Sequence, residues 1–323
     1  MDHTAQQQFF RDWGHLQDPH VRALAWMLTS PQLLDESRFI SASQIAEIDM
    51  PSHTQLTTWF AELEQDPSQF HVSLDLERHR RLGHYAENLL AYFFRHQENL
   101  VAHGLQIHDA KKRTIGEFDF LVEQKIGLLH LEIATKFYLL FSDAALVESN
   151  NLFDFLGPNL ADSLGAKMGK IVDQQLSLSA HPLAQALLPR PVSAAQALVK
   201  GWLFYPHSQS RSWRTSDVTL PGIIANHSRG FWCGLDELYS VNFEQALILP
   251  RLSWLAPAIA RTEEVLTKAE VMQEISQHFT RDHSPLMLAL MQETNGHMRE
   301  FARGMIVPED WVDQARIRRP LGN

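Results

Sequence analysis

The sequence predicts an α/β fold with a central mixed β-sheet flanked by helices. Three observations predict it: an amphipathic helix after residue 81, three strand-like segments behind it, and a second helix that leads to another apolar strand. The chain has 323 residues, 45% apolar and 20% charged, an ordinary globular balance. We expect a core over residues 81–257, a helical N-terminal extension over 1–80 and a helical C-terminal region over 258–323, together forming one compact unit.

The N-terminal extension should contain short helices. Asp18 or Pro19 can begin one, and apolar residues then recur at helical spacing from Val21 to Leu28. Residues 51–60 indicate a second short helix.

The core should begin with a helix, because apolar side chains recur three or four residues apart at Leu82, Tyr85, Ala86, Leu89, Leu90 and Phe93. Strands are then predicted at residues 101–108, 117–122 and 128–136, a helix over 164–178, and strands at 197–205, 222–232 and 246–255. Residues 269–279 and 285–291 indicate two closing helices.

The strand around GEFDF carries carboxylates among apolar residues. Side chains alternate between the two faces of a strand, so Glu117 and Asp119 should share one face. Phe118, Phe120 and Val122 should share the opposite face.

The next strand, LLHLEIATK, places Glu132 and Lys136 on one face by the same alternation. If residues 123–127 form a hairpin turn, Asp119 lies on the same side of the sheet, with Glu117 beside it. The simplest interpretation is a half-exposed sheet with a wet polar face.

Acids that face each other on adjoining strands repel unless a cation lies between them. Glu87, on the flank of the first helix, offers a third acid. A divalent cation would relieve this crowding, because Mg²⁺ prefers oxygen ligands and is commonly held by one or two carboxylates plus water and phosphate.

The helix with Glu87, the GEFD segment that ends at Asp119 and the strand LEIATK resemble the pattern of the PD-(D/E)XK nuclease-like superfamily. The resemblance covers residues 82–205, and the whole chain resembles an uncharacterised bacterial family of unknown function assigned to that superfamily. It implies a restriction-endonuclease-like core. It also implies that Asp119 and Glu132 are catalytic metal ligands and that Glu87 is an extra metal ligand.

The lysine of that pattern lies two residues after the acid, where this sequence has Ala134. Lys136 lies two residues farther on the same predicted face, about 7 Å along the strand, and its side chain can reach back. Lys167 or Lys170, on the next helix, could serve instead.

The chemistry that the resemblance implies is phosphodiester hydrolysis in DNA or RNA. Mg²⁺ or Mn²⁺ held by Asp119 and Glu132 would polarise the phosphate and lower the pKa of an attacking water. Lys136 would orient that water or stabilise charge. Gln175, on the apolar stripe of the second helix, is either an auxiliary site residue or a hydrogen-bonded core amide.

A second interpretation keeps the fold without catalysis, as a degenerate module that binds nucleic acid or a protein partner. Ala134 favours it, as does the formal charge of −10, which excludes a general nucleic-acid coating but leaves room for a local basic cleft. A third interpretation is a purely structural acidic sheet.

The composition limits which disulfides, metal sites and membrane segments we expect in the chain. Cys233 is the only cysteine, so the chain can form neither an intrachain disulfide nor a cysteine-based zinc site. No window approaches ~18 consecutive apolar residues, and the N-terminal MDHTAQQQFF lacks the features of a secretory signal. We therefore expect a cytoplasmic protein without a membrane span, of open oligomeric state.

Overall fold

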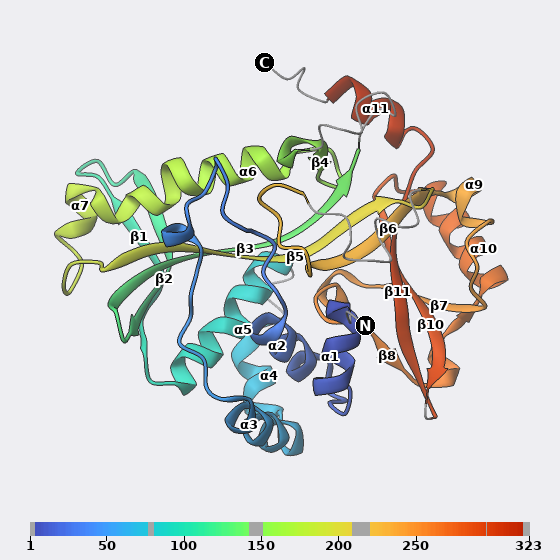
Figure 1. Ribbon diagram of the computed structural model, residues 1–323, viewed down its shortest axis with the longest axis horizontal. Helices are drawn as coiled ribbons and strands as arrows, with labels where there is room; N and C mark the ends of the chain where they lie inside the picture. The colour runs from blue at the N-terminus through green and yellow to red at the C-terminus, as the bar shows by residue number, and fades with distance from the viewer. Residues whose placement is uncertain (1–3, 77–80, 142–150, 209–219, 295, 319–323) are drawn as a thin grey trace.

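A computed structural model describes residues 4–76, 81–141, 151–208, 220–294 and 296–318. In these residues eleven strands form one sheet, with nine in the order β1-β2-β3-β5-β6-β11-β10-β7-β9, β4 paired with β3, and β8 paired with β11. Helices lie on both faces of this mixed sheet (Figure 1). The predicted α/β class with a central mixed sheet flanked by helices is confirmed.

The N-terminal part forms helices that pack beneath the sheet in Figure 1: α1 (Ala5–Trp13), α2 (Pro19–Thr29), α3 (His53–Gln65) and α4 (Ser68–Leu74). The predicted start of α2 is confirmed. The Asp18 side chain accepts hydrogen bonds from the backbone N–H groups of His20 and Val21, and Pro19 occupies the first helical position.

The central part has the predicted order of helix, three strands, helix and strand. Its main elements are α5 (Leu82–His96), β1 (Leu100–His108), β2 (Thr114–Gln124), β3 (Gly127–Leu140), α6 (Leu164–Lys170), α7 (Pro182–Gln185) and β5 (Ala194–Pro206), with the short β4 (Phe155–Leu156) beside β3. Strands β1, β2 and β3 form an antiparallel meander, and β5 runs parallel to β3. A crossover connection is therefore required between β3 and β5, and α6 lies in it.

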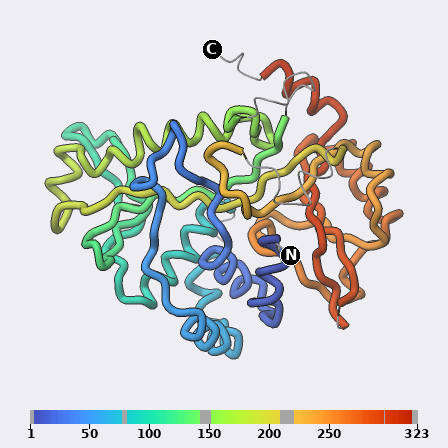
Figure 2. Tube along the Cα trace, in the orientation of Figure 1, coloured from blue at the N-terminus to red at the C-terminus, as the bar shows by residue number. Residues whose placement is uncertain are grey.

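The two faces of this part are covered by different helices, as the colours in Figure 2 make clear. On one face, α5 packs Phe93 and Phe94 with Phe120 and Leu131 of the sheet. The helix predicted over 164–178 covers the other face, but in three pieces: α6, the π-helical turn η4 (Ile171–Gln175) and the 3₁₀ turn η5 (Leu176–Ala180).

The predicted alternation along β2 is wrong at one point. Phe118 packs with Leu178 on the α6 side, whereas Phe120 packs on the α5 side. Gly104 on the neighbouring strand β1 has a φ of 63°, a conformation that glycine adopts readily and that interrupts regular alternation. Asp119 lies between the two phenylalanines, at the break.

The C-terminal part continues the sheet. It contains β6 (Ser228–Gly234), α9 (Leu235–Leu238), β7 (Gln245–Leu249), the 3₁₀ turn η6 (Arg251–Ser253), β8 (Ile259–Ala260), β9 (Leu266–Thr267), α10 (Lys268–Phe279), β10 (Leu286–Thr294), β11 (His297–Val307) and α11 (Trp311–Arg318). The predicted helix over 269–279 is confirmed as α10. The strands predicted at 222–232 and 246–255 are shorter than expected.

The predicted helix over 285–291, and with it a helical region over 258–323, is wrong. Strands β10 and β11 form an antiparallel hairpin inside the sheet. The run LMLALM is buried on both faces, so its apolar residues show no strand alternation, and a short apolar run cannot be distinguished from a buried helix by periodicity.

Among the described helices, none combines the length and the apolar character that crossing a bilayer would require.

Candidate functional site

Two carboxylates meet where β2 and β3 diverge. The paired residues of these strands end at Phe120 and Leu131, and the next residue on each strand is Asp119 and Glu132. Beyond this fork β2 continues beside β1, and β3 continues beside β5. The Ile133 backbone N–H donates to Asp119 Oδ2 at 2.9 Å, and the Asp119 N–H reaches Glu132 Oε1 at 3.5 Å. The expected convergence of the two acids is therefore present.

The fork is too buried for water to solvate two negative charges well. Glu132 is 1% exposed, and Asp119 is mostly buried. Burial, followed by the charge of Glu132, raises the pKa of Asp119 to about 8, and Glu87 adds to the effect. Without a cation, the pair therefore retains a proton near neutral pH.

Two neighbours hold the Glu132 carboxylate in place. His130 Nε2 lies 2.8 Å from Oε1, and the Gln175 amide donates to Oε2 at 2.5 Å. His130 is fully buried, and its Nδ1 contacts no hydrogen-bond partner in the described part of the chain. His130 was not among the site residues expected from the sequence, although its position two residues before Glu132 places both on one strand face.

Gln175 reaches Glu132 from the π-helical turn η4. This turn follows α6 and is wider than an α-helical turn, which changes the direction of the side chains behind it. Gln175 Oε1 also accepts a hydrogen bond from the Lys167 ammonium at 3.3 Å. A continuous chain of contacts therefore links Lys167 to Glu132 through one amide.

The lysines differ in what surrounds them. Burial and then Lys170 lower the pKa of Lys167, while Asp119 and Glu132 raise it. Burial and then Lys167 lower the pKa of Lys136, and the acid that opposes this is Asp162 rather than the fork carboxylates. The structure thus brings Lys167 to the acids and Lys136 to a neighbouring position. Lys170 is exposed.

The other two acids considered from the sequence lie outside the contact network. Glu87 on α5 contacts His84 at 3.2 Å and affects Asp119 through its charge alone. Glu117 is exposed and accepts a hydrogen bond from Gln106 at 2.9 Å. Neither carboxylate contacts the Asp119–Glu132 pair.

The donors at the fork suit a hard cation held by few protein ligands. Among the described residues, no group of three or more His, Cys, Asp or Glu side chains could hold a metal ion. Mg²⁺ needs no such cage, because one or two carboxylates with waters and substrate phosphates commonly complete its shell. Burial is the first cause of the raised pKa of Asp119 and the charge of Glu132 the second, and a cation beside the two carboxylates would favour their charged forms. The Asp119 and Glu132 carboxylates therefore fit Mg²⁺ or Mn²⁺, with Gln175 as a hydrogen-bond partner of Glu132.

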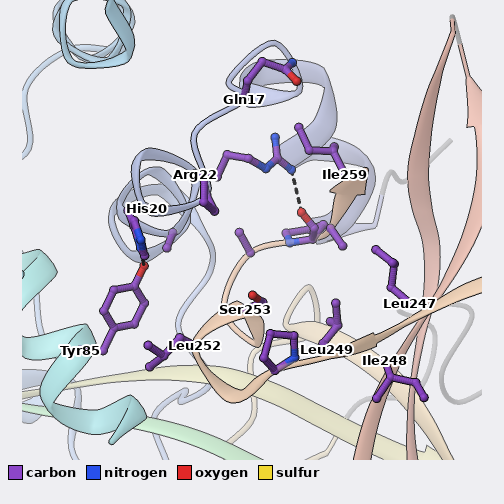
Figure 3. A pocket seen from close by; sticks show the side chains of 16 residues that line it. Gln17, His20, Arg22, Tyr85, Leu247, Ile248, Leu249, Leu252, Ser253 and Ile259 are labelled. Carbon is purple, nitrogen blue, oxygen red and sulfur yellow. Dashed lines mark hydrogen bonds between the residues drawn. The ribbon is translucent and has the colours of Figure 1, made fainter. Parts of the chain in front are cut away.

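Away from the fork, a cavity of about 280 Å³ lies on the α5 side of the sheet (Figure 3). His20 Nδ1 lies 2.8 Å from the Tyr85 hydroxyl, and Arg22 donates to the Pro257 carbonyl at 2.7 Å. Most of the lining is apolar, and the described residues that form it include no acid. His20, Tyr85 and Arg22 find hydrogen-bond partners within the protein, and the cavity lacks the facing carboxylates found at the fork.

Comparison with known proteins places most of the chain in one family. A family model described as Domain of unknown function (DUF1853) matches residues 22–307. Neither the curated proteins nor the solved structures contained a match.

Proposed function

We propose that this chain, which belongs to the DUF1853 family, is a metal-dependent nuclease that hydrolyses phosphodiester bonds in DNA or RNA. The observation that carries the proposal is the convergence of Asp119 and Glu132 at the strand fork, with Lys167 linked to them through Gln175. The order of α5, β1, β2, β3, α6 and β5 further supports a likeness to the PD-(D/E)XK nuclease-like superfamily and its restriction-endonuclease-like core.

Asp119 and Glu132 would hold a divalent cation, with Mg²⁺ or Mn²⁺ as the candidates. When bound, the cation supplies Lewis-acid polarisation of the phosphate and a lowered pKa for an attacking water. The chain itself would orient the reactants. His130 and Gln175 fix the direction of the Glu132 carboxylate, as hydrogen-bond partners of metal ligands commonly do.

Lys167 takes the role that the sequence first suggested for Lys136. Its ammonium lies within hydrogen-bond distance of Gln175 and in the field of both acids, so it is placed to stabilise charge that develops on the phosphate. Lys136 remains on the same strand as Glu132 but is oriented among Lys167, Lys170 and Asp162.

The test is cleavage of single- and double-stranded DNA and RNA by purified protein with Mg²⁺ or Mn²⁺. Wild type should cleave at least one substrate, and Asp119→Asn and Glu132→Gln should lose this activity. Glu117→Gln is the matched control, because Glu117 lies on the same strand without contacting the pair. Equal cleavage by wild type and Asp119→Asn would refute the proposal.

One observation favours the second candidate, a catalytically degenerate module that binds nucleic acid or a protein partner. Both oxygens of Glu132 already accept hydrogen bonds within the protein, so a cation must displace or share them. Calorimetry with Mg²⁺ or Mn²⁺ separates the candidates: a nuclease site releases or absorbs heat that Asp119→Asn abolishes, and a degenerate site gives none.

A further inference from the structure

A cavity of about 570 Å³ opens beside the fork, near the carboxyl end of β3. The start of α5, residues 135–138 of β3, the loop 157–162 and the turn η6 line it, together with Trp254 and Pro285. Lys136 therefore lines this cavity. The lining residue of β3 nearest to Glu132 is Thr135, three residues farther along the strand, so the cavity lies beyond the fork on the same strand.

Three cations and one acid, Asp162, line the cavity. Arg81, Lys136 and Arg251 form no ion pair within the described residues, whereas Arg251 lies over the Trp254 ring at 5.2 Å. Lys136 is partly buried, whereas Arg81 and Arg251 are exposed. The cavity therefore gathers more positive than negative charge, and a concave surface lined by one sign of charge attracts ions of the other sign.

The backbone contributes positive potential to the same cavity. Leu82 and Gly83, the first residues of the 15-residue helix α5, line it, and Arg81 before them makes no side-chain capping bond. The first turn contains no acid, so the positive end of the helix dipole is uncompensated there. Asp162 is the one acid in the lining, among the described residues, and it accepts a hydrogen bond from the Tyr138 hydroxyl at 3.0 Å.

We infer that this cavity binds the backbone phosphates of the nucleic-acid strand on one side of the bond that the fork would cleave. This inference rests on the proposed function and names where its substrate extends. Glu132 and Lys136 are four residues apart, about 13 Å along the strand at ~3.3 Å per residue. A stacked nucleic-acid strand advances ~3.4 Å per nucleotide. The cavity would therefore contact phosphates roughly four nucleotides from the reacting one.

The experiment measures binding without cleavage. A fluorescently labelled single-stranded oligonucleotide is titrated with Asp119→Asn protein in the presence of a chelator, at several salt concentrations. Adding Arg81→Ala, Lys136→Met or Arg251→Ala should weaken binding about tenfold. Each should also flatten the log–log salt dependence of affinity by a slope of ~0.7 for every phosphate that the variant no longer binds. Lys111→Ala, an exposed lysine in the turn between β1 and β2, is the charge-matched control and should bind like its parent.

Two further arms make the result decisive. Arg81→Lys and Arg251→Lys keep the charge and should retain most of the affinity, and matching melting temperatures exclude unfolding. Inorganic phosphate should compete only weakly, because it supplies one anion where a strand supplies several. The inference is overturned if the cavity variants bind the oligonucleotide like Lys111→Ala, or if phosphate binds the cavity while the strand does not. If the cavity variants bind the oligonucleotide more weakly but wild type cleaves no substrate, the proposed nuclease activity is refuted. The role of the cavity in binding the strand then still stands.

Discussion

The Glu300–Arg303 pair and the Asp119–Glu132 pair bury charge in opposite ways. Both side chains of the first pair are 0% exposed, and Arg303 donates to Glu300 Oε2 at 2.6 Å. Arg303 also donates to the carbonyls of Trp254 and Ala256. At the fork Asp119 and Glu132 face each other, and the Gln175 amide lies between the Lys167 ammonium and Glu132.

This difference separates a structural network from a candidate site. The Glu300–Arg303 network satisfies its charges internally, which is the condition under which buried charge is tolerated in a folded protein. The fork leaves like charges together, and such arrangements cluster at functional sites. The next five predictions test this contrast.

The largest expected effect is a loss of stability when the Glu300–Arg303 network is broken. Arg303→Ala leaves the buried Glu300 carboxylate without its cation, so we expect the free energy of unfolding to fall by about 3–5 kcal/mol. Denaturant unfolding followed by circular dichroism measures this. A fall below about 1 kcal/mol would mean that the network is not the internally balanced unit described above.

At the fork, activity rather than stability should respond. Lys167→Met should lower the cleavage rate by about 100-fold or more, because it removes a cation proposed to stabilise the reacting phosphate. Its melting temperature should stay close to that of wild type. Lys136→Met is the informative comparison in the same assay, and a larger drop in rate there would return the leading role to Lys136.

The Asp119 carboxyl should make stability depend on pH. Its folded pKa, about 8, lies above its ordinary value of 3.8, so the folded state binds the extra proton. As far as this group decides it, stability should therefore be highest at low pH and decline between about pH 4 and pH 8. Asp119→Asn should remove this decline, which unfolding experiments across pH can measure. The same slope in both proteins would contradict the electrostatic description of the fork.

Added Mg²⁺ offers a check on the same group. Its binding should strengthen as pH rises toward 8, since the ligand must lose its proton first.

The smallest effect is expected at Gln175. Gln175→Ala removes the amide that connects Lys167 to Glu132, and partners of metal ligands typically contribute about 10- to 100-fold. Cleavage should fall by about tenfold, with weaker Mg²⁺ affinity in calorimetry. Gln174→Ala, at an exposed neighbouring position, should leave both unchanged.

The meander and its acids could be predicted from the sequence because they depend on local rules. Period-two alternation and a short turn are sufficient to bring Asp119 and Glu132 together, and helical spacing is sufficient to find α5. The contact of Gln175 with Glu132 depends on a π-helical turn, which no period in the sequence indicates. The link from Lys167 to Glu132 passes through that turn, so the sequence could offer Lys167 only as an alternative.

The C-terminal half was harder to predict for a different reason. Strands β10 and β11 lie inside the sheet, and their residues 287–291 and 302–307 are buried on both faces, so the apolar pattern that distinguishes strand from helix is missing there. The break between Phe118 and Phe120 lies opposite Gly104 of β1, which has a positive φ, and the residue pattern of β2 alone does not indicate it. Prediction therefore succeeded where the pattern was local and failed where neighbouring strands decided it.

The π-helical turn also has a consequence for how this family could vary. An α-helix rotates by about 100° per residue, so deleting a single residue between Ile171 and Gln175 would restore ordinary helical winding and swing the amide away from Glu132. Leu176 and Leu178, which follow Gln175 and pack on the sheet, would shift as well. The loss of one codon would thus disturb both the hydrogen bond to Glu132 and the packing of this segment on the sheet.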